Sequence, residues 1–509
     1  MEQTMDSLVE RYKEHIQGTL SCFDRVVLSG TLPDICYPGA MAAHLRELNI
    51  RLFDFPAWAN TLRDELRENA QVIAKEAGVQ IEFIAKKGAF RKEARIKQII
   101  KQRGDHPGLV HIFSAMERCT AYQPWYDKST GRTELKTREG KCLHYYFYCI
   151  DAELGLCYLR VPTWAPFRLQ FYFNGHQWLA RQLENQNVAF TLIDNAFVSI
   201  DDFERAQQLS DSFNPKRLHQ ILDRYASIFC PIAEWFRTPV RWTIMQVEYA
   251  TDLVFRRRED LKRFYDPLIR TALCSIKAEN VAKFLGRTRL SQNFAGELGS
   301  DLGTRVEGTR LKHMMANSSI KMYDKLGLVL RLETTTNDVR FFYHYRTVVH
   351  RDGGRSSTKV APVLKTIYSL GTMARLLLAA NDRYSSFLAA LDQPDVNPAV
   401  VYKIARPVRK NNRSYRGFNL FCGIDLSVFL AVVRGEFTIS GFRNRDLQPL
   451  LAQTGQQVSR LLTRLRLHGL IKKVARRHKY YMTSLGKRVI ACALRFMSEC
   501  IVPTLAQLG

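Results

Sequence analysis

The 509-residue chain lacks the segments that mark membrane-spanning and secreted proteins. No apolar run approaches the roughly 18 to 20 residues that cross a bilayer, and the charged opening MEQTMDSLVERYKEHI has no apolar signal-peptide core. The 11 cysteines are scattered, odd in number and without a CxxC pair, so neither a disulfide framework nor a zinc clip is indicated. We therefore expect a cytoplasmic protein with reduced thiols and no membrane contact.

The sequence also lacks the short motifs of the common nucleotide- and metal-dependent enzymes. It has no GxxxxGK[ST] loop, no GxGxxG after an apolar run, no HExxH and no Cys/His zinc grouping. None of its 12 histidines forms an HxH pair, which argues against a standard rolling-circle replication endonuclease. No cofactor is evident, the metal ligands stay unknown, and Mg²⁺ is expected only if the protein is a catalyst.

Acidic residues are scarce relative to basic ones, above all near the C-terminus. The chain has 75 Lys and Arg against 49 Asp and Glu, a net charge of +26. From residue 401 onward there are 20 Lys and Arg and only 4 Asp and Glu, so +16 of this charge lies in the last 109 residues. Such a surplus indicates a polyanionic partner, because neutralised phosphates release counterions. Nucleic acid is the leading partner; an anionic membrane surface and an ordinary basic protein are the alternatives.

Alternating strand and helix patterns predict an α/β (α+β) body of several layers with mixed sheets, followed by a C-terminal winged helix-turn-helix domain. Within the body, residues from about 201 to 285 read as a mostly helical segment. We expect an N-terminal α/β domain at 1–122, an α+β body at 141–391, a basic linker at 392–417 and the winged helix at 418–509. The polar stretch 123–140 is expected to be a long hairpin loop. In the linker, Arg409, Lys410 and Arg413 are candidate nucleic-acid contacts.

The last hundred residues carry the clearest pattern. Helices are expected at 425–434, 444–452 and 456–469, the last with a buried stripe of Val458, Leu461, Leu462 and Leu465. Polar residues of this third helix fall largely away from that stripe, where they can reach base edges and phosphates: Gln456, Gln457, Ser459, Arg460, Thr463 and Arg464.

The phrase RLRLHGLIKKV followed by YYMTSLG resembles the MarR-type winged-helix families, over about 80 residues. The resemblance implies that the third helix enters the major groove of duplex DNA. It also implies that Arg476, Arg477 and Lys479 hold the backbone from the tip of the wing. A homodimer is a further expectation for the chain. Protein contact and RNA binding are the alternative uses of the same fold.

A second, shorter phrase, SSIKMYDKLGLVLRLETTTND, resembles the IKxYxK…LRxE strands of phage and plasmid replication initiators. By that resemblance Tyr323 is a candidate nucleophile and Glu333 part of a metal and strand-transfer site. The alternative is a packed hairpin with a charged outer face. Aromatic stretches that include Arg168, Arg340 and Arg346 could bind structured RNA or single strands, although core packing explains most of those rings.

Carboxylates at strand ends form a further candidate set. A two-metal nuclease or transposase needs three or four acids that converge on Mg²⁺. The candidates are acids within or at the ends of expected strands, together with Glu248 and Asp252, which are expected to share one helical face: Asp24, Glu117, Asp151, Asp194 and Glu333. Any α/β protein of this size has many acids, so only geometry can show whether they meet.

Phrases such as PFRLQFYFNGHQWLARQL and GTRLKHMMANSSIKMYDK resemble, nearly end to end, a bacterial mobile-element-like group of proteins whose activity is not established. Three hypotheses follow. The first is a nucleoid-associated protein that binds mobile-element DNA or RNA. The second is a Mg²⁺-dependent nuclease, transposase or initiator-like strand-transfer enzyme, and the third is the core of a ribonucleoprotein with its own non-coding RNA. Three carboxylates within about 4 to 6 Å of one point would favour the enzyme.

Overall fold

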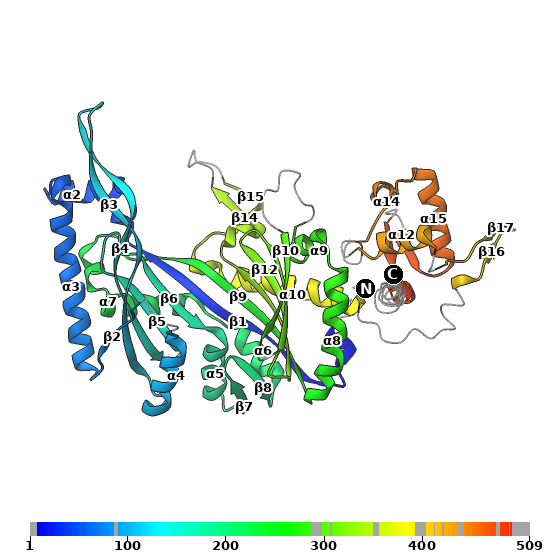
Figure 1. The fold of residues 1–509 in the computed structure, drawn as a ribbon, viewed down its shortest axis with the longest axis horizontal. Helices are drawn as coiled ribbons and strands as arrows, with labels where there is room; N and C mark the ends of the chain where they lie inside the picture. The colour runs from blue at the N-terminus through cyan, green and yellow to red at the C-terminus, as the bar shows by residue number, and fades with distance from the viewer. Residues whose placement is uncertain are drawn as a thin grey trace, which may run out of the picture. The chain divides into compact units, whose positions relative to one another are not determined.

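A computed structural model (Figure 1) describes most of the chain. The residues described are 8–85, 90–287, 298–305, 308–349, 356–391, 404–411, 413–419, 422–434, 437, 441–474, 479–487 and 489–490. None of the helices in these ranges combines the length and apolarity needed to cross a bilayer. The cysteines for which the structure describes a side chain are all free thiols.

The helices alternate with strands along most of the chain. Their bounds are α1 Leu8–Tyr12, α2 Pro38–Glu47, α3 Phe55–Glu76, α4 Lys92–Arg103, α5 Gly175–Asn185, α6 Phe203–Asp211, α7 Pro215–Phe229, α8 Arg258–Ser275, α9 Ala278–Phe284, α10 Leu370–Leu391, α12 Gly423–Val432, α14 Asn444–Leu451 and α15 Gly455–Leu467. Short 3-10 turns are η1 Pro33–Ile35, η2 Leu52–Asp54, η3 Pro231–Trp235, η4 Val339–Phe341 and η5 Ile367–Ser369.

The strands differ widely in length, from three residues to twenty. Their bounds are β1 Ile16–Thr31, β2 Ile81–Phe83, β3 Gly108–Asp127, β4 Arg132–Asp151, β5 Gly155–Pro162, β6 Leu169–Asn174, β7 Phe190–Ile193, β8 Ala196–Ile200, β9 Arg241–Phe255, β10 Leu298–Arg305, β11 Gly308–Met315, β12 Ser318–Lys325, β13 Val329–Thr336, β14 Tyr343–Val349, β15 Ser356–Pro362, β16 Val408–Lys410, β17 Arg413–Tyr415, β18 Ile471–Val474 and β19 Lys479–Met482.

One eleven-stranded sheet organises the body. Its order is β10-β11-β12-β13-β9-β1-β6-β5-β4-β3-β2. Most printed pairings, such as β1 with β6 and β3 with β4, are antiparallel, whereas β2 runs parallel to β3. The sheet is therefore mixed, which confirms the expected α/β architecture with a mixed sheet. Contacts divide the chain into two compact units. One unit consists of residues 20–250 and 335–376, and the other consists of residues 1–19, 251–334 and 377–509. Strands β1, β9 and β13 have residues in both.

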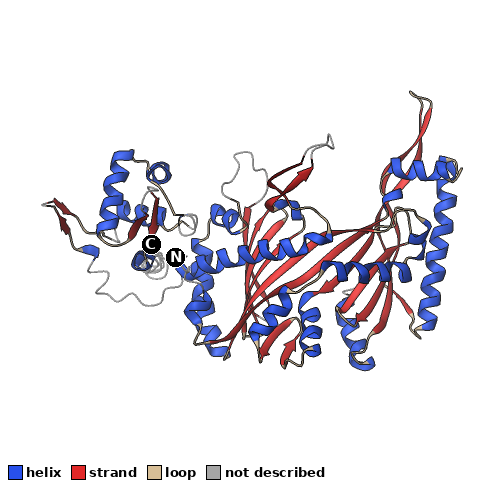
Figure 2. Ribbon diagram, turned by 180° about the vertical axis from the view of Figure 1, so that it is seen from behind, coloured by secondary structure: helices blue, strands red, loops and turns tan. Residues whose placement is uncertain are grey.

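Within the unit 20–250 and 335–376, aromatic residues of β4 to β6 fill the core on both faces of the sheet. Phe147 stacks on Phe229 of α7 with ring centroids 4.4 Å apart. The alternate residues Tyr146 and Tyr148 join the apolar cluster around Ile96 of α4. Because neighbouring strand residues point to opposite faces, the run HYYFYC supplies both layers. Figure 2 shows helices in front of and behind the strands.

Two segments differ from the sequence-based expectation. The segment 201–285 was expected to be mostly helical, but the fifteen-residue strand β9 lies inside it, so Glu248 and Asp252 lie on a strand and not on a helix. Residues 123–140 are paired strand up to the turn of a hairpin and not a long hairpin loop, because β3 and β4 pair without interruption from His111 with Tyr148 to Asp127 with Arg132. Their hairpin tip projects beyond the helices in Figure 1.

The C-terminal part has its own apolar core. Helices α12, α14 and α15 and the β18–β19 hairpin enclose Val428, Phe429, Leu447, Val458 and Leu465, among others. Val458, Leu462 and Leu465 are buried, as the expected stripe of α15 requires, and Leu461 is half-buried. The basic segment before α12 contains a small hairpin, β16–β17, in which Lys410 faces Arg413.

A glycine lets α5 start directly against β1. A Cβ atom on Gly175 would lie 2.1 Å from the backbone oxygen of Phe23, far inside van der Waals contact. Gly175→Ala should therefore lower the free energy of unfolding by about 1–3 kcal/mol, because the backbone of β1 or α5 must shift. Denaturant unfolding of the full chain measures this. Gly371→Ala is the control, because its added Cβ meets nothing within 4 Å, and equal stability of the two variants would contradict the prediction.

Candidate functional site

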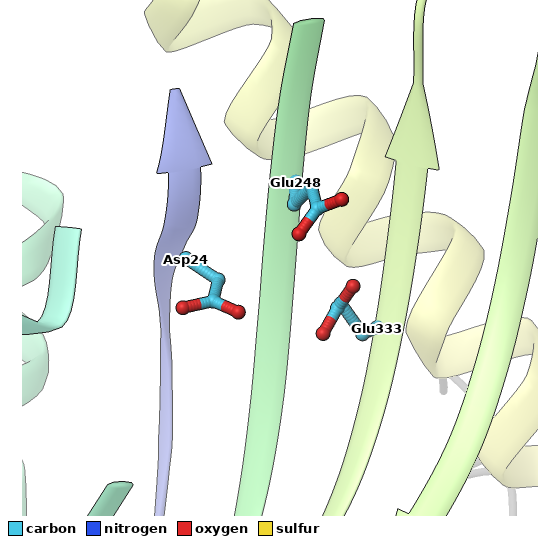
Figure 3. Close-up of side chains that lie close together, drawn as sticks. All are labelled: Asp24, Glu248 and Glu333. Atoms are coloured by element: carbon cyan, nitrogen blue, oxygen red, sulfur yellow. The ribbon is translucent and has the colours of Figure 1, made fainter. Parts of the chain in front are cut away.

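Three carboxylates lie close together on neighbouring strands of the sheet. Asp24 is on β1, Glu248 on β9 and Glu333 on β13, and these strands are adjacent in the sheet. Each residue offers one carboxylate oxygen, and these oxygens all lie within 4.8 Å of one another. Figure 3 shows the three side chains in front of the strands that carry them. Asp24 and Glu333 are buried, and Glu248 is half-buried. The carboxylates are called the acidic triad below.

Hydrogen bonds fix the carboxylate of Asp24. Asn174 at the end of β6 donates from Nδ2 at 3.0 Å, and Asn195 in the β7–β8 turn donates at 2.5 Å. The Nδ1 atom of the buried His176 lies 3.2 Å from the same carboxylate. Asn174 also caps α5, because its Oδ1 accepts from the backbone N–H of His176 and Gln177. The start of α5 is therefore tied to the acidic triad through one amide side chain.

Glu333 is held by two residues of the adjacent strand β12. Lys321 forms an ion pair with its Oε1, and the Tyr323 hydroxyl donates to its Oε2 at 2.6 Å. Residues two apart on a strand lie on the same face, so Lys321 and Tyr323 both reach Glu333 from one side of the sheet. Glu248 in turn accepts from the Gln246 amide at 3.2 Å. Lys321 therefore places a cationic group directly beside the acidic triad.

Helix α10 covers the opposite face of these strands. The Asn381 side chain bridges Thr251 of β9 and Thr334 of β13, with bonds of 3.1 and 2.7 Å. Glu333 follows the alternate side of β13 and so points away from α10, which lies behind the strands in Figure 3. On the same side as Glu333, Arg331 makes a two-bond pair with Asp252 at 2.6 and 2.7 Å, and both are buried.

The acidic triad matches the ligand chemistry of a hard divalent cation. Mg²⁺ prefers oxygen ligands at about 2.1 Å, so two of its ligands are at most about 4.2 Å apart. The spacing within 4.8 Å is close to this limit, and movements of less than about 1 Å would let all three carboxylates bind one ion. Asp24, Glu248 and Glu333 are therefore the residues that would hold Mg²⁺.

The other acids singled out in the sequence lie in ion pairs of the body. Asp151 accepts from Arg224 at 2.6 Å and from the Tyr225 hydroxyl at 3.2 Å. Asp194 pairs with Lys97, and Glu117 accepts from Tyr146 and pairs with Arg160. The structure thus brings Asp24, Glu333 and Tyr323 together and leaves Asp151 and Asp194 outside. The sequence does not predict the contacts of Asn174, Asn195 and His176 with Asp24. The one available indication was that Asn174 stands where a helix cap is expected before α5.

A second candidate site is the surface of α15 in the C-terminal part. Gln456, Gln457, Ser459 and Arg460 are exposed, and Thr463 is half-buried. Ser459 and the helix start are tied to α14, because the Asn444 amide donates to Ser459 Oγ and to the Gly455 carbonyl, both at 2.8 Å. Lys479 is half-buried on β19, whereas Arg476 and Arg477 lie outside the described residues. Arg409, Lys410 and Arg413 are exposed on the β16–β17 hairpin.

Arg464 does not belong to that exposed surface, so its expected orientation is wrong. Its guanidinium is buried and makes two bonds to Asp425 of α12, at 2.8 and 2.9 Å. It also donates to the carbonyls of Arg416 and Gly417 and lies 3.7 Å from the ring centroid of Phe418. Arg464 therefore joins α15 both to α12 and to the segment directly after β17.

The pair between Arg464 and Asp425 predicts a pH-dependent stability. Burial raises the pKa of Asp425, but hydrogen bonds from the Arg464 guanidinium and from the backbone N–H of Asn419 outweigh this effect, so that the pKa is lowered below 3.8. A lowered pKa contributes stability that is complete above the unfolded-state value and is lost as the pH falls through the folded-state value.

Arg464→Leu should lower the free energy of unfolding by on the order of 3 kcal/mol at neutral pH, which is the lower end of the range for a broken buried ion pair. The lower end is expected because Arg416 remains 3.4 Å from the Asp425 carboxylate. The deficit should begin to shrink below a pH of about 4, where Asp425 is protonated in the unfolded chain, and should disappear only as the pH falls through the lowered pKa of the folded state. Thermal unfolding across pH, with hydrogen exchange of α12 and α15 as the local readout, measures both. The exposed neighbour Arg466 provides the control, Arg466→Leu. A deficit that does not change with pH would refute the assignment.

No family model, no curated protein and no solved structure matches the chain. The resemblances noted in the sequence therefore stay predictions, and the two sites are interpreted from their own geometry.

Proposed function

We propose that the protein binds duplex nucleic acid, DNA above all, through a winged helix formed by its C-terminal residues. The supporting elements follow one another as helix, helix, helix and hairpin: α12, α14, α15 and β18–β19. Thr454 between α14 and α15 caps the third helix through the Gln457 N–H. This order of elements supports the proposal of a helix-turn-helix followed by a wing.

One observation carries the proposal. Phe442, just before α14, forms an antiparallel bridge with Tyr480 of β19, with N···O distances of 2.9 and 2.7 Å. The strand segment ahead of the second helix therefore pairs with the hairpin after the third, which adds a third strand segment to the wing. The arrangement leaves the polar face of α15 uncovered in the described residues, with Arg460 on it. The net charge of +16 after residue 400 supplies the attraction to phosphates.

Arg460→Ala should weaken duplex binding about 10- to 100-fold, the effect of losing one base or phosphate contact. Binding of a labelled mixed-sequence duplex at several salt concentrations measures it. Arg466→Ala, on the same helix and also exposed, is the matched loss of charge and should matter less. Equal affinities of wild type and Arg460→Ala at every salt concentration would count against α15 as the recognition helix.

A second candidate function is metal-dependent cleavage or transfer of phosphodiester bonds, and the acidic triad favours it. Bound Mg²⁺ would polarise a phosphoryl oxygen and stabilise the charge that develops on it. Asp24 and Glu333 would hold the ion from buried, hydrogen-bonded positions, and Glu248 from a half-buried one. Lys321 and Tyr323, both on Glu333, would orient that carboxylate. The mobile-element role is a proposal from sequence resemblance alone, and the ribonucleoprotein role is a separate proposal.

Glu248→Gln should abolish Mg²⁺- or Mn²⁺-dependent cleavage of plasmid DNA and oligonucleotides, and should weaken Mn²⁺ binding at least about 10-fold, because it removes one anionic ligand. Glu248 is the least buried member of the acidic triad, so this substitution perturbs folding least. Asp194→Asn, outside the triad, is the control. Mn²⁺ binding followed by electron paramagnetic resonance tests the ion separately from activity. Unchanged Mn²⁺ affinity in Glu248→Gln would exclude the triad as a metal site.

A further inference from the structure

A groove runs along the C-terminal part between the β16–β17 hairpin and helices α12 and α15. Its volume is about 640 Å³. The hairpin side is formed by Arg413, Ser414, Tyr415 and Arg416, and the opposite side includes Gln457 and Arg460 of α15. The groove therefore lies beside the polar face of α15 that the proposed function assigns to duplex DNA.

The lining of the groove has two chemically distinct parts. Four arginines line it against one aspartate, Asp425, and that aspartate is already paired with Arg464 and lies near Arg416. The groove is thus cationic. Its apolar part comes from Ile424 and Val428 of α12 and Leu461 of α15. Ile424 is 60% exposed and lines the groove with an apolar side chain.

Buried contacts hold the hairpin side of the groove in place. Arg464 donates to the carbonyls of Arg416 and Gly417, directly after β17, at 3.0 and 2.6 Å. The Phe418 N–H donates to the Ile404 carbonyl at 2.9 Å, which closes the base of the segment that carries the hairpin. The two sides of the groove are therefore joined through Arg464, and the groove is formed before any ligand binds.

We propose that this groove binds an unpaired strand of nucleic acid next to the duplex on α15, an inference that rests on the proposed function. A strand of unpaired nucleotides combines a phosphate backbone with flat apolar bases, and a site for it combines cations with aromatic and apolar contacts. Arg413 and Arg416 match the backbone, and Tyr415 with Ile424 and Leu461 matches the bases. A duplex hides its base faces by stacking, so it would leave the apolar part of the groove unused. The protein thus holds a junction of double- and single-stranded nucleic acid.

The test measures the affinity of the full chain for three labelled probes of one mixed sequence: single-stranded DNA, single-stranded RNA and duplex DNA. Ile424→Ser should weaken binding of the preferred single strand about 10-fold, and Tyr415→Ala as much, because each removes contacts to a base. Tyr415→Phe keeps the ring and should bind like wild type. A plot of the logarithm of single-strand affinity against the logarithm of salt concentration should become less steep by about 0.7 in Arg413→Ala, because this is the change expected for one lost phosphate contact.

Val72→Ser is the matched control, because Val72 is an exposed aliphatic residue on α3. Duplex affinity should stay within about twofold in Ile424→Ser and Tyr415→Ala, which also reports that the domain is folded. If the wild-type protein binds duplex but neither single strand, the inference is overturned and the proposed function stands. The same conclusion follows if Ile424→Ser binds single strands as tightly as the wild-type protein does. Wild type that binds none of the probes would overturn both, and the ratio of DNA to RNA affinity identifies the strand.

Discussion

The pleat of the long strands is the constraint on which the body depends. Side chains two residues apart share a face, so one strand can present an apolar row to a helix and a charged row to the other side. On β9 and β13, Thr251 and Thr334 face α10 through Asn381, while Glu248 and Glu333 turn the other way. Charge on one face is therefore compatible with a buried core on the other, and the acidic triad follows from this separation.

The C-terminal part obeys a different rule, set by burial of an ion pair. A guanidinium enters an apolar core only when carboxylate and carbonyl oxygens satisfy its donors. Arg464 meets this condition with Asp425 and two backbone carbonyls. The same contacts join three segments of chain that are separated in sequence. Exposed arginines on either side then remain available to an anionic partner.

The sequence predicts local structure better than it predicts the sites. The apolar stripe of α15 and the aromatic strands β4 and β5 follow directly from periodicity. A spacing of four residues gives Glu248 and Asp252 a common face in a strand as well as in a helix, so the spacing alone does not separate the two structures. The burial of Arg464 does not follow from the periodicity of α15, because its partner lies on another helix, 39 residues away in sequence. Likewise, nothing in the chain near Asp24 indicates Asn195, whose contact depends on the fold.

The buried pair of Arg331 and Asp252 has a consequence for strand pairing. A slip of one residue between two strands turns every side chain of the moving strand to the other face. For β13 such a slip would carry Arg331 to the α10 side and break its buried two-bond pair with Asp252, which costs several kcal/mol. The pair therefore acts as a register lock. Because Glu333 is only two residues further along β13, the pair also favours the register in which Glu333 reaches Lys321 and Tyr323.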